Sequence, residues 1–186
     1  FERTVGGKDR ACGTHGGVKV YKEVDYKEVS REIMEQLPKG AFLTVKNGDK
    51  VNTMTIAWGA MGFIWKKPIF NVLVRYSRYT HELIHNADEF TVSFPLYGQL
   101  DDALNVCGTK SGRNIDKFAE CALKTQKGRV VDTPVISGCN IHLECRIVYR
   151  QGMVPENLDD GIKKSCYPAG DYHVMYCGEI VAAYRE

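Results

Sequence analysis

The spacing of apolar residues along the chain predicts a β-rich protein with a few helices. Val29, Ile33 and Leu37 recur at intervals that place them on one face of a helix, which Pro38 ends. From Cys139 to Tyr149 apolar and polar residues alternate, which predicts an antiparallel strand with one buried and one solvent-facing side. The same criteria predict helices over residues 26–37, 98–106 and 116–123, a short helix from Ser77 or Thr80 to about Ala87, and strands over 41–46, 50–56, 69–75, 89–94, 139–149 and 172–184.

The stretch from Val51 to Phe63, VNTMTIAWGAMGF, changes character midway. The Asn47-Gly48 dipeptide before it is a strong hairpin signal, so its first half is expected to be the second arm of a β-hairpin. After Ile56 the alternation gives way to Trp58 among glycines and alanines. Small residues let a planar ring approach the main chain, with Trp58 as an apolar wall. They equally suit a bulge beside a core tryptophan, and the sequence leaves both alternatives open.

Hairpins, many strands and few helices predict a mainly β fold, an antiparallel barrel with helical insertions. We assign residues 31–186 to one domain and residues 1–30 to an N-terminal extension. Hydrophobic residues make up 44% and charged residues 26%, as in soluble globular proteins, and no run approaches the ~20 apolar residues of a membrane span. The net charge of +2 and the scattered basic residues argue against nucleic-acid binding.

The seven cysteines are odd in number and include no Cys-x-x-Cys pair, which predicts reduced thiols in a cytoplasmic protein. Cys12 and His15 could form half of a zinc site, but no second half follows them. We therefore favour a flexible terminal segment there and expect no metal. Cys107 has no evident base nearby and is expected to be a buried, inert thiol.

Two segments combine cations and hydroxyls just before predicted helices: Arg75-Tyr-Ser-Arg-Tyr-Thr80 and Ser111-Gly-Arg-Asn-Ile-Asp-Lys117. Helix N-termini and arginine forks both suit a phosphate, although solvated loops with capping hydroxyls have the same composition. His173 lies near a predicted strand end, where a histidine is structural or catalytic. The motifs for serine and zinc hydrolases, P-loop phosphoryl transfer and Rossmann dinucleotide binding are absent. A site for a flat, anionic ligand remains.

Taken in order, these segments resemble the flavin reductase-like family, and most closely its flavoredoxin-type members. The matching pieces are Asn52-Thr-Met-Thr-Ile-Ala-Trp-Gly59, Pro68, Arg75-Tyr-Ser-Arg-Tyr-Thr80, Glu89-Phe-Thr-Val-Ser-Phe-Pro95, Ser111-Gly-Arg-x-x-Asp-Lys-Phe118, Leu143-Glu-Cys145 and His173-x-x-x-x-Gly178-Glu. The resemblance implies an FMN-binding split β-barrel, usually a homodimer with the flavin near the subunit interface.

The resemblance also implies roles for particular residues of this chain. His173 would lie close to the exposed face of the flavin and position the electron donor, whereas Tyr172 stands where many flavin reductases have an acidic residue. The residues implied to bind FMN are Asn52, Thr53, Met54, Thr55, Ile56, Ala57 and Trp58 along the ring system, Arg75, Ser77, Arg78 and Thr80 around the phosphate, and Ser111, Arg113 and Lys117 as further contacts.

By this resemblance we expect an FMN-dependent oxidoreductase that transfers electrons through bound FMN, with NAD(P)H as one candidate donor. One alternative is an FMN-containing electron carrier that docks to redox partner proteins without consuming NAD(P)H. Another is a non-catalytic flavin-binding module. The sequence does not separate the three, because the family lacks a portable nicotinamide motif.

Overall fold

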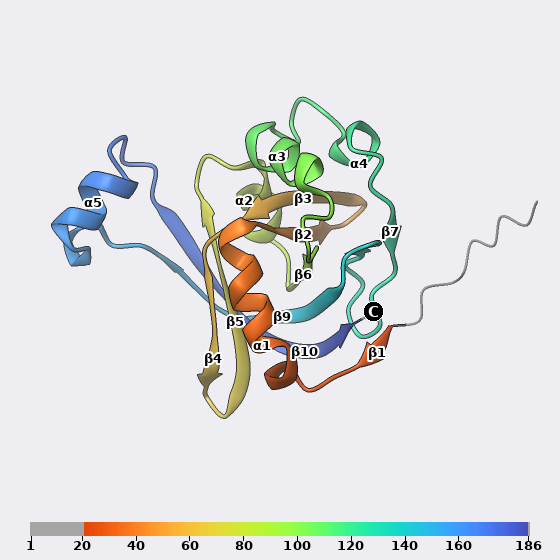
Figure 1. Ribbon diagram of the computed structural model, residues 1–186. Coiled ribbons are helices and arrows are strands. Elements are labelled where there is room, and N and C mark those ends of the chain that lie inside the picture. Colours follow the sequence, from red (N-terminus) through yellow and green to blue (C-terminus); the bar gives the residue numbers. More distant parts are fainter. Residues whose placement is uncertain (1–20, 186) are drawn as a thin grey trace, which may run out of the picture.

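The computed structural model describes residues 21–185 and shows a curved eight-stranded antiparallel sheet with helices packed around it (Figure 1). The two short strands β7 and β8 pair in a separate sheet. Its mostly β composition with few helices confirms the predicted fold class. The strands are β1 (Lys22–Glu23), β2 (Ala41–Asn47), β3 (Lys50–Ile56), β4 (Gly59–Ile64), β5 (Lys67–Arg75), β6 (Glu89–Phe94), β7 (Thr125–Gln126), β8 (Val135–Ile136), β9 (Ile141–Gly152) and β10 (His173–Arg185). The helices are α1 (Tyr26–Gln36), α2 (Tyr79–Ile84), α3 (Asp101–Thr109), α4 (Lys117–Glu120) and α5 (Asp160–Cys166), with short 3-10 turns η1 (Leu37–Lys39) and η2 (Pro155–Asn157).

The order of the strands brings the two edges of the sheet together. The order is β3-β2-β6-β9-β10-β5-β4, with β1 added beside β10. β3 and β4 therefore form opposite edges, although only Ala57 and Trp58 separate them in sequence. Three peptide units span at most about 11 Å, so the sheet must curl until its edges nearly meet at this point. The result is a barrel that stays open between β3 and β4.

β10 runs through the middle of the sheet and pairs with both β9 and β5. Its register against β9 shifts between Cys177 and Gly178. A Cβ atom on Gly178 would lie 2.5 Å from Cζ of Phe90 and 2.7 Å from Cβ of Cys145. Only glycine fits at this position of β10, because Phe90 of β6 and Cys145 of β9 fill the space beside it.

Helices cover both faces of the predicted β2–β3 hairpin, whose strands form as expected. On the inner face, Leu43 of β2 belongs to the main apolar core together with Val29 and Ile33 of α1. On the outer face, Phe42 belongs to a second apolar cluster with Leu104 of α3. α2, whose Leu83 and Ile84 belong to the same main core, and α3 both contact the two strands of the hairpin, and they fix the position of β3.

The polar side of β9 is buried at His142 and Glu144, which corrects the prediction of a solvent-facing side over this part of the strand, whereas Arg146 is exposed as predicted. His142 and Glu144 are fully buried. The Glu144 carboxylate accepts hydrogen bonds from the backbone N–H groups of Val130 and Val131, at 2.7 and 2.9 Å, and from the hydroxyl of Tyr184 at 2.8 Å. These donors replace the solvent that a carboxylate otherwise requires. Glu144 thus fastens the preceding loop onto the sheet.

The strand β4 was not predicted, because residues 59–64 carry glycines and alanine where a strand usually has bulky residues. The tight turn after it is also hidden in the sequence, since Trp65 and Lys66 have positive φ angles of 53° and 59°. Glycine or asparagine usually occupies such positions. Pro68, expected to precede the next strand, lies inside β5 opposite Phe63.

Other helix predictions need correction. α5 lies where a loop was expected, at the end of the arm between β9 and β10 (Figure 1). It contains no buried residue, so it has no apolar stripe that a sequence pattern could reveal. α2 ends at Ile84 and is capped by neither predicted hydroxyl, since Arg78 is its N-cap residue. α3 begins later than predicted and includes Gly108 and Thr109, whereas α4 spans only the first part of its predicted range.

The N-terminal predictions fall mostly on residues that the structure does not describe. Cys12 and His15 lie there, so the half zinc site is outside the described residues. Within residues 21–30, β1 pairs with β10 and α1 already contributes Val29 to the core. The boundary drawn at residue 31 therefore falls inside α1. The six cysteines of residues 21–185 are free thiols, and no helix in this range is long and apolar enough to span a membrane.

Replacing Gly178 by alanine tests the crossing of β10, β9 and β6. The added methyl group would overlap Phe90 and Cys145, and overpacking of this kind costs typically 1–3 kcal/mol. We expect urea unfolding to show a loss of that size. The control is Gly62→Ala in β4, where an added Cβ meets no atom within 4 Å. Equal stabilities of the two variants would contradict the close packing at Gly178.

Candidate functional site

A cavity of about 160 Å³ lies where β3 ends, at the opening between the two edges of the sheet. All but one of its lining residues were singled out in the sequence. The lining consists of Met54, Thr55, Ile56, Ala57, Trp58, Leu73, Arg75, Arg78 and His173. The register of β10 against β5 places His173 directly opposite Arg75. The sheet therefore brings three distant segments of the sequence to one wall.

Trp58 borders this cavity and is not part of the core. Its side chain is 43% exposed, which excludes the alternative of a core tryptophan beside a bulge. The centre of its ring system lies 5.2 Å from that of His173, with the two planes tilted by 48°. An indole and an imidazole thus stand side by side at the opening of the cavity.

His173 is nearly buried, and its ring is held by one hydrogen bond. Its Nδ1 atom lies 2.8 Å from the hydroxyl of Tyr167, a residue that the sequence did not single out. Burial, and after it the positive charge of Arg75, lowers the pKa of His173 to about 4. The imidazole is therefore neutral near pH 7, so it can donate or accept a hydrogen bond but carries no charge.

Arg75 and Ser77, both predicted to bind phosphate, are engaged by the segment that precedes β10. The guanidinium of Arg75 donates to the carbonyl oxygens of Asp171 (2.6 Å) and Cys166 (3.0 Å) and lies 5.1 Å from the ring centre of Tyr167. The hydroxyl of Ser77 donates to the Asp171 carboxylate at 2.6 Å. In this structure the two residues brace the arm that carries α5 and present few free donors.

A second cavity, of about 120 Å³, shares Met54 and Arg78 with the first and extends along the start of α2. Its walls hold four cations and several hydroxyl groups, and no carboxylate is among its described lining residues. The lining consists of Met54, Ser77, Arg78, Tyr79, Thr80, Cys107, Thr109, Lys110, Ser111, Gly112, Arg113 and Lys117. The two segments proposed from sequence to hold an anion thus meet in one hollow.

Lys117 is the most unusual cation of this cavity, because its side chain is buried. Its Nζ atom donates to the carbonyl oxygens of Thr53 at 3.0 Å and of Cys107 at 2.8 Å. An ammonium has three N–H donors, so one remains. Burial lowers the pKa of Lys117, and no carboxylate within residues 21–185 forms an ion pair with it. This leaves a buried cation without a counter-ion.

The turn at residues 111–113 is held close to β3. A Cβ atom on Gly112 would lie 2.1 Å from Oδ1 of Asn52, so only glycine permits this approach. Asn52 also donates to the hydroxyl of Thr80 at 2.8 Å and so joins β3 to α2. Arg113 is paired with the carboxylate of Glu82. Asn52 therefore shapes the cavity from behind, outside its described lining.

Two of the predicted residues on β3 face elsewhere. The side chain of Thr53 is fully buried, and its hydroxyl donates to the carbonyl of Leu43 at 3.2 Å. Thr53 therefore meets the site only through its own carbonyl, which binds Lys117. Thr55 lines the first cavity, but its hydroxyl donates to the carbonyl of Leu104 in α3 at 2.6 Å.

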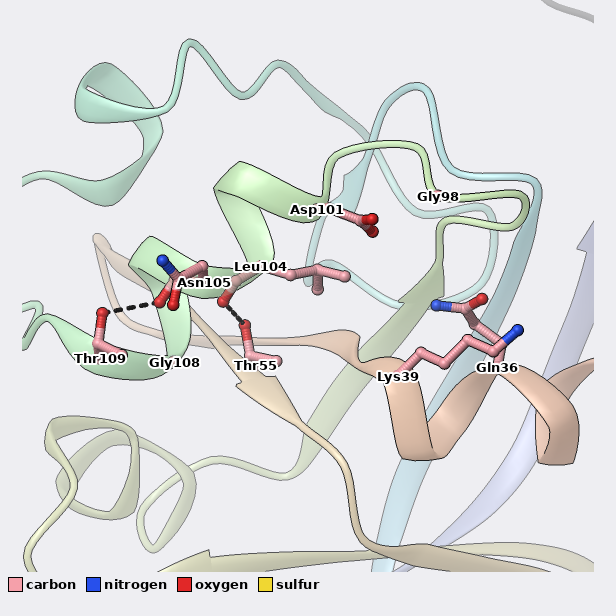
Figure 2. Close-up of a pocket in the computed structure, with 9 residues that line it drawn as sticks. All are labelled: Gln36, Lys39, Thr55, Gly98, Asp101, Leu104, Asn105, Gly108 and Thr109. Carbon is pink, nitrogen blue, oxygen red and sulfur yellow. Dashed lines mark hydrogen bonds between the residues drawn. The ribbon is translucent and has the colours of Figure 1, made fainter.

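Thr55 also borders a third, larger cavity of about 670 Å³ on the other side of β3 (Figure 2). Figure 2 shows that this cavity lies between the helix α3, with Asp101 and Asn105, and the segment that carries Gln36 at the end of α1 and Lys39 in η1. It holds one cation and one carboxylate, so its charges do not select a ligand of one sign. None of the sequence-predicted anion ligands line it.

Comparison with known families decides the relationship of this chain. A family model described as the flavin reductase like domain matches residues 34–186. The chain belongs to the flavin reductase-like family. An uncharacterized protein of Archaeoglobus fulgidus is 33% identical over 111 residues, which cover 60% of this chain and 62% of that relative. A second, from Pyrococcus abyssi, is 26% identical over 153 residues and covers 80% of this chain and 76% of that relative.

Solved structures of the flavin reductase-like type share the fold and confirm the predicted split barrel. A flavoredoxin from Methanosarcina acetivorans is 28% identical, with a TM-score of 0.61, and covers 79% of this chain and 68% of its own. The FMN-binding domain of a flavin reductases-like enzyme from Shewanella baltica is 17% identical, with a TM-score of 0.66, over 89% and 77% of the two chains. An NADH:FAD oxidoreductase from Streptomyces globisporus is 22% identical, with a TM-score of 0.60, over 89% and 87%.

The site of this flavin reductase-like domain contains residues that the sequence did not indicate. Leu73 lines the first cavity from β5, Tyr167 bonds His173, and Asp171 holds Ser77. Leu73 is one of many apolar residues in a strand, and its position follows only from the pairing of β5 with β10. Tyr167 and Asp171 lie in the arm between β9 and β10, where no periodic pattern marks them.

The lowered pKa of His173 predicts how its stability contribution depends on pH. An unfolded histidine has a pKa of about 6.5, so between pH 6.5 and 4 the unfolded state binds more protons than the folded state. As the pH falls through this window, His173 therefore lowers the free energy of unfolding, by about 2–3 kcal/mol at pH 4. Urea unfolding at pH 7 and pH 4 should show a smaller acid loss in His173→Gln than in the wild type. The same loss in both would contradict a buried, neutral His173.

Proposed function

We propose that this domain binds FMN and transfers electrons through it. The observation that carries the proposal is the pair of adjoining cavities, which share Met54 and Arg78. One has an aromatic side chain and close main chain along its wall, and the other gathers cations and hydroxyls. FMN is a flat ring joined to a phosphate, so its site requires an aromatic wall next to a group of cations and hydroxyls. The family membership and the FMN-binding relatives support the same ligand.

The phosphate would lie in the second cavity, among Arg78, Ser111 and Lys117. Arg78 makes one hydrogen bond, to the carbonyl of Gly108 at 3.3 Å, so most of its donors are free. Burial lowers the pKa of Lys117, and the like charge of Arg78 contributes to this lowering through repulsion between the two cations. An anion between them removes this repulsion and supplies the missing counter-ion of the buried ammonium.

The ring system would lie along residues 54–58, with Trp58 and His173 at its edge. Bound FMN would supply the one- and two-electron transfer. His173, neutral near pH 7 and bonded to Tyr167, is suited to orient a donor by hydrogen bonding. With a pKa of about 4, His173 is almost entirely unprotonated at neutral pH. We therefore assign it a positioning role, in which it does not need to donate a proton.

Replacing Arg78 by alanine tests the phosphate end of the site. Loss of a charge-assisted contact should weaken FMN binding by about 10- to 100-fold. Riboflavin has no phosphate, so its affinity should change far less. Fluorescence titration with both flavins measures the ratio, and Arg146→Ala, at an exposed arginine of β9, is the matched control. Equal losses for FMN and riboflavin, or equal losses in both variants, would refute this placement.

We propose NAD(P)H as the electron donor, with the electron-carrier role as the second candidate. The 43% exposure of Trp58 favours the second candidate, because it leaves an aromatic group at the surface where a redox partner protein could dock. Anaerobic spectra of the FMN-loaded protein separate the two roles. Bleaching by NADH or NADPH supports the oxidoreductase, bleaching by dithionite alone supports the carrier, and no bleaching by either leaves a non-catalytic flavin-binding module.

We also propose that two copies of the chain form a homodimer through the tip of the β4–β5 hairpin. This hairpin extends beyond the rest of the sheet (Figure 1). Its tip exposes Phe63 (65%) and Trp65 (57%), with Ile64 beside them, and the ring centre of Trp65 lies 5.9 Å from that of Tyr149. Clustered exposed apolar side chains of this kind mark interaction surfaces.

Aspartate at both Phe63 and Trp65 should separate such a dimer. Two charges at a surface that becomes buried would cost several kcal/mol on association. Analytical ultracentrifugation should give a dimer for the wild type and a monomer for the double variant. Tyr97→Asp is the control, because Tyr97 is an 80% exposed aromatic residue outside the hairpin. A wild-type monomer, or a double variant that remains dimeric, would count against this interface.

A further inference from the structure

Two cysteines that the proposed function does not use lie together beside the second cavity. Cys107 belongs to α3 and is 1% exposed, whereas Cys121, just after α4, is partly exposed. Cys107 belongs to the outer apolar cluster with Leu104, and Cys121 packs against this cluster together with Phe118. Cys121 is near enough to Cys107 to contribute to the raised pKa of its thiol, after burial. Both thiols are reduced in this structure. The two cysteines are neighbours in space, although their spacing in sequence resembles no redox motif.

These two cysteines stand at the two ends of the segment that carries the anion-binding turn. Between them lie Lys110, Ser111, Gly112, Arg113 and Lys117, all of which line the second cavity. Lys117 links the two ends, because its Nζ atom donates to the carbonyl of Cys107 at 2.8 Å and its own carbonyl accepts from the backbone N–H of Cys121 at 3.1 Å. The segment is therefore a loop whose ends already touch.

We propose that Cys107 and Cys121 form a reversible disulfide that closes this loop and restrains the anion-binding turn. The oxidant is a low-molecular-weight disulfide, which is reduced to two thiols while the pair loses two electrons and two protons. The Cys121 thiolate attacks one sulfur of the oxidant and releases the first small thiol. Cys107 then attacks the Cys121 sulfur of the mixed disulfide, and its proton passes to the departing second small thiolate.

The environment of the two thiols sets the order and the speed of these steps. Burial raises the pKa of Cys107 to about 12, so its thiolate is scarce at neutral pH. The reaction must therefore begin at the more accessible Cys121, and the closing step is slow. The site responds to sustained oxidation and does not turn over rapidly.

Closure would stabilise the protein through the unfolded state. A cross-link around a loop of about 15 residues removes conformational freedom from the unfolded chain. For a protein of this size, the melting temperature should rise by roughly 5–10 °C. Backbone amides of residues 108–120 should also exchange more slowly with solvent, because local opening of the turn is restricted.

The experiment uses the full chain treated with glutathione disulfide, then alkylated, digested and mapped by mass spectrometry. We expect a linked pair of peptides that contain Cys107 and Cys121, with a higher melting temperature and slower hydrogen exchange in residues 108–120. Dithiothreitol should reverse all three. Cys121→Ser should abolish the link and the shifts. Cys166→Ser, at another partly exposed cysteine, should leave both unchanged and serves as the matched control.

Two results would overturn the inference. One is recovery of Cys107 and Cys121 as separate alkylated or glutathionylated peptides after prolonged oxidation. The other is a linked pair that forms without any change in exchange over residues 108–120. Cys121→Ser removes a partly exposed side chain and should fold, and far-UV circular dichroism checks this. None of these measurements requires a bound flavin, so they are independent of the proposed function.

Discussion

The two-residue link between β3 and β4 is the constraint on which the rest of the structure depends. Ala57 and Trp58 join strands at opposite edges of the sheet, so the sheet must curl until those edges meet. The backbone leaves β3 at this point with no strand beside it on one side. The first cavity opens there, and Trp58 stands at its entrance. The position of the site thus follows from how the barrel closes.

The fold also determines which positive charges of the site are free to bind a ligand. Arg75 and Ser77 are bonded to the arm between β9 and β10, so the free positive charge comes chiefly from Arg78 and the buried Lys117. The ammonium of Lys117 donates to carbonyls of β3 and α3, so its position depends on both elements. A fold that keeps two cations close without a carboxylate pays in stability, and an anionic ligand offsets that cost.

Much of this site could be predicted from the sequence because its signals are local. The residue types alone indicated the Asn47-Gly48 hairpin and the two clusters of cations and hydroxyls, and the fold brings these segments together. That Trp58 is exposed could not be decided, since a tryptophan among small residues suits both a core and a cavity wall. Which cations are free was also hidden, because the carbonyl partners of Arg75, in Cys166 and Asp171, lie 91 and 96 residues away.

The missed elements have physical reasons as well. α5 buries none of its residues, so its sequence carries no amphipathic spacing, and its N-cap residue Asp159 is the one local signal that could have found it. The buried face of β9 was read as solvent-facing because Glu144 is charged. Its partners are backbone N–H groups of the loop that precedes β9 and the hydroxyl of Tyr184, and no side-chain pattern in β9 indicates them.

A crystal structure of the protein with FMN tests the central claim most directly, because it shows both ends of the ligand at once. We predict electron density for the phosphate within hydrogen-bond distance of Lys117 Nζ and Ser111, and for the ring along residues 54–58 beside Trp58 and His173. Density for the flavin in the cavity between α1 and α3 (Figure 2), or a phosphate that leaves Lys117 without contact, would contradict it.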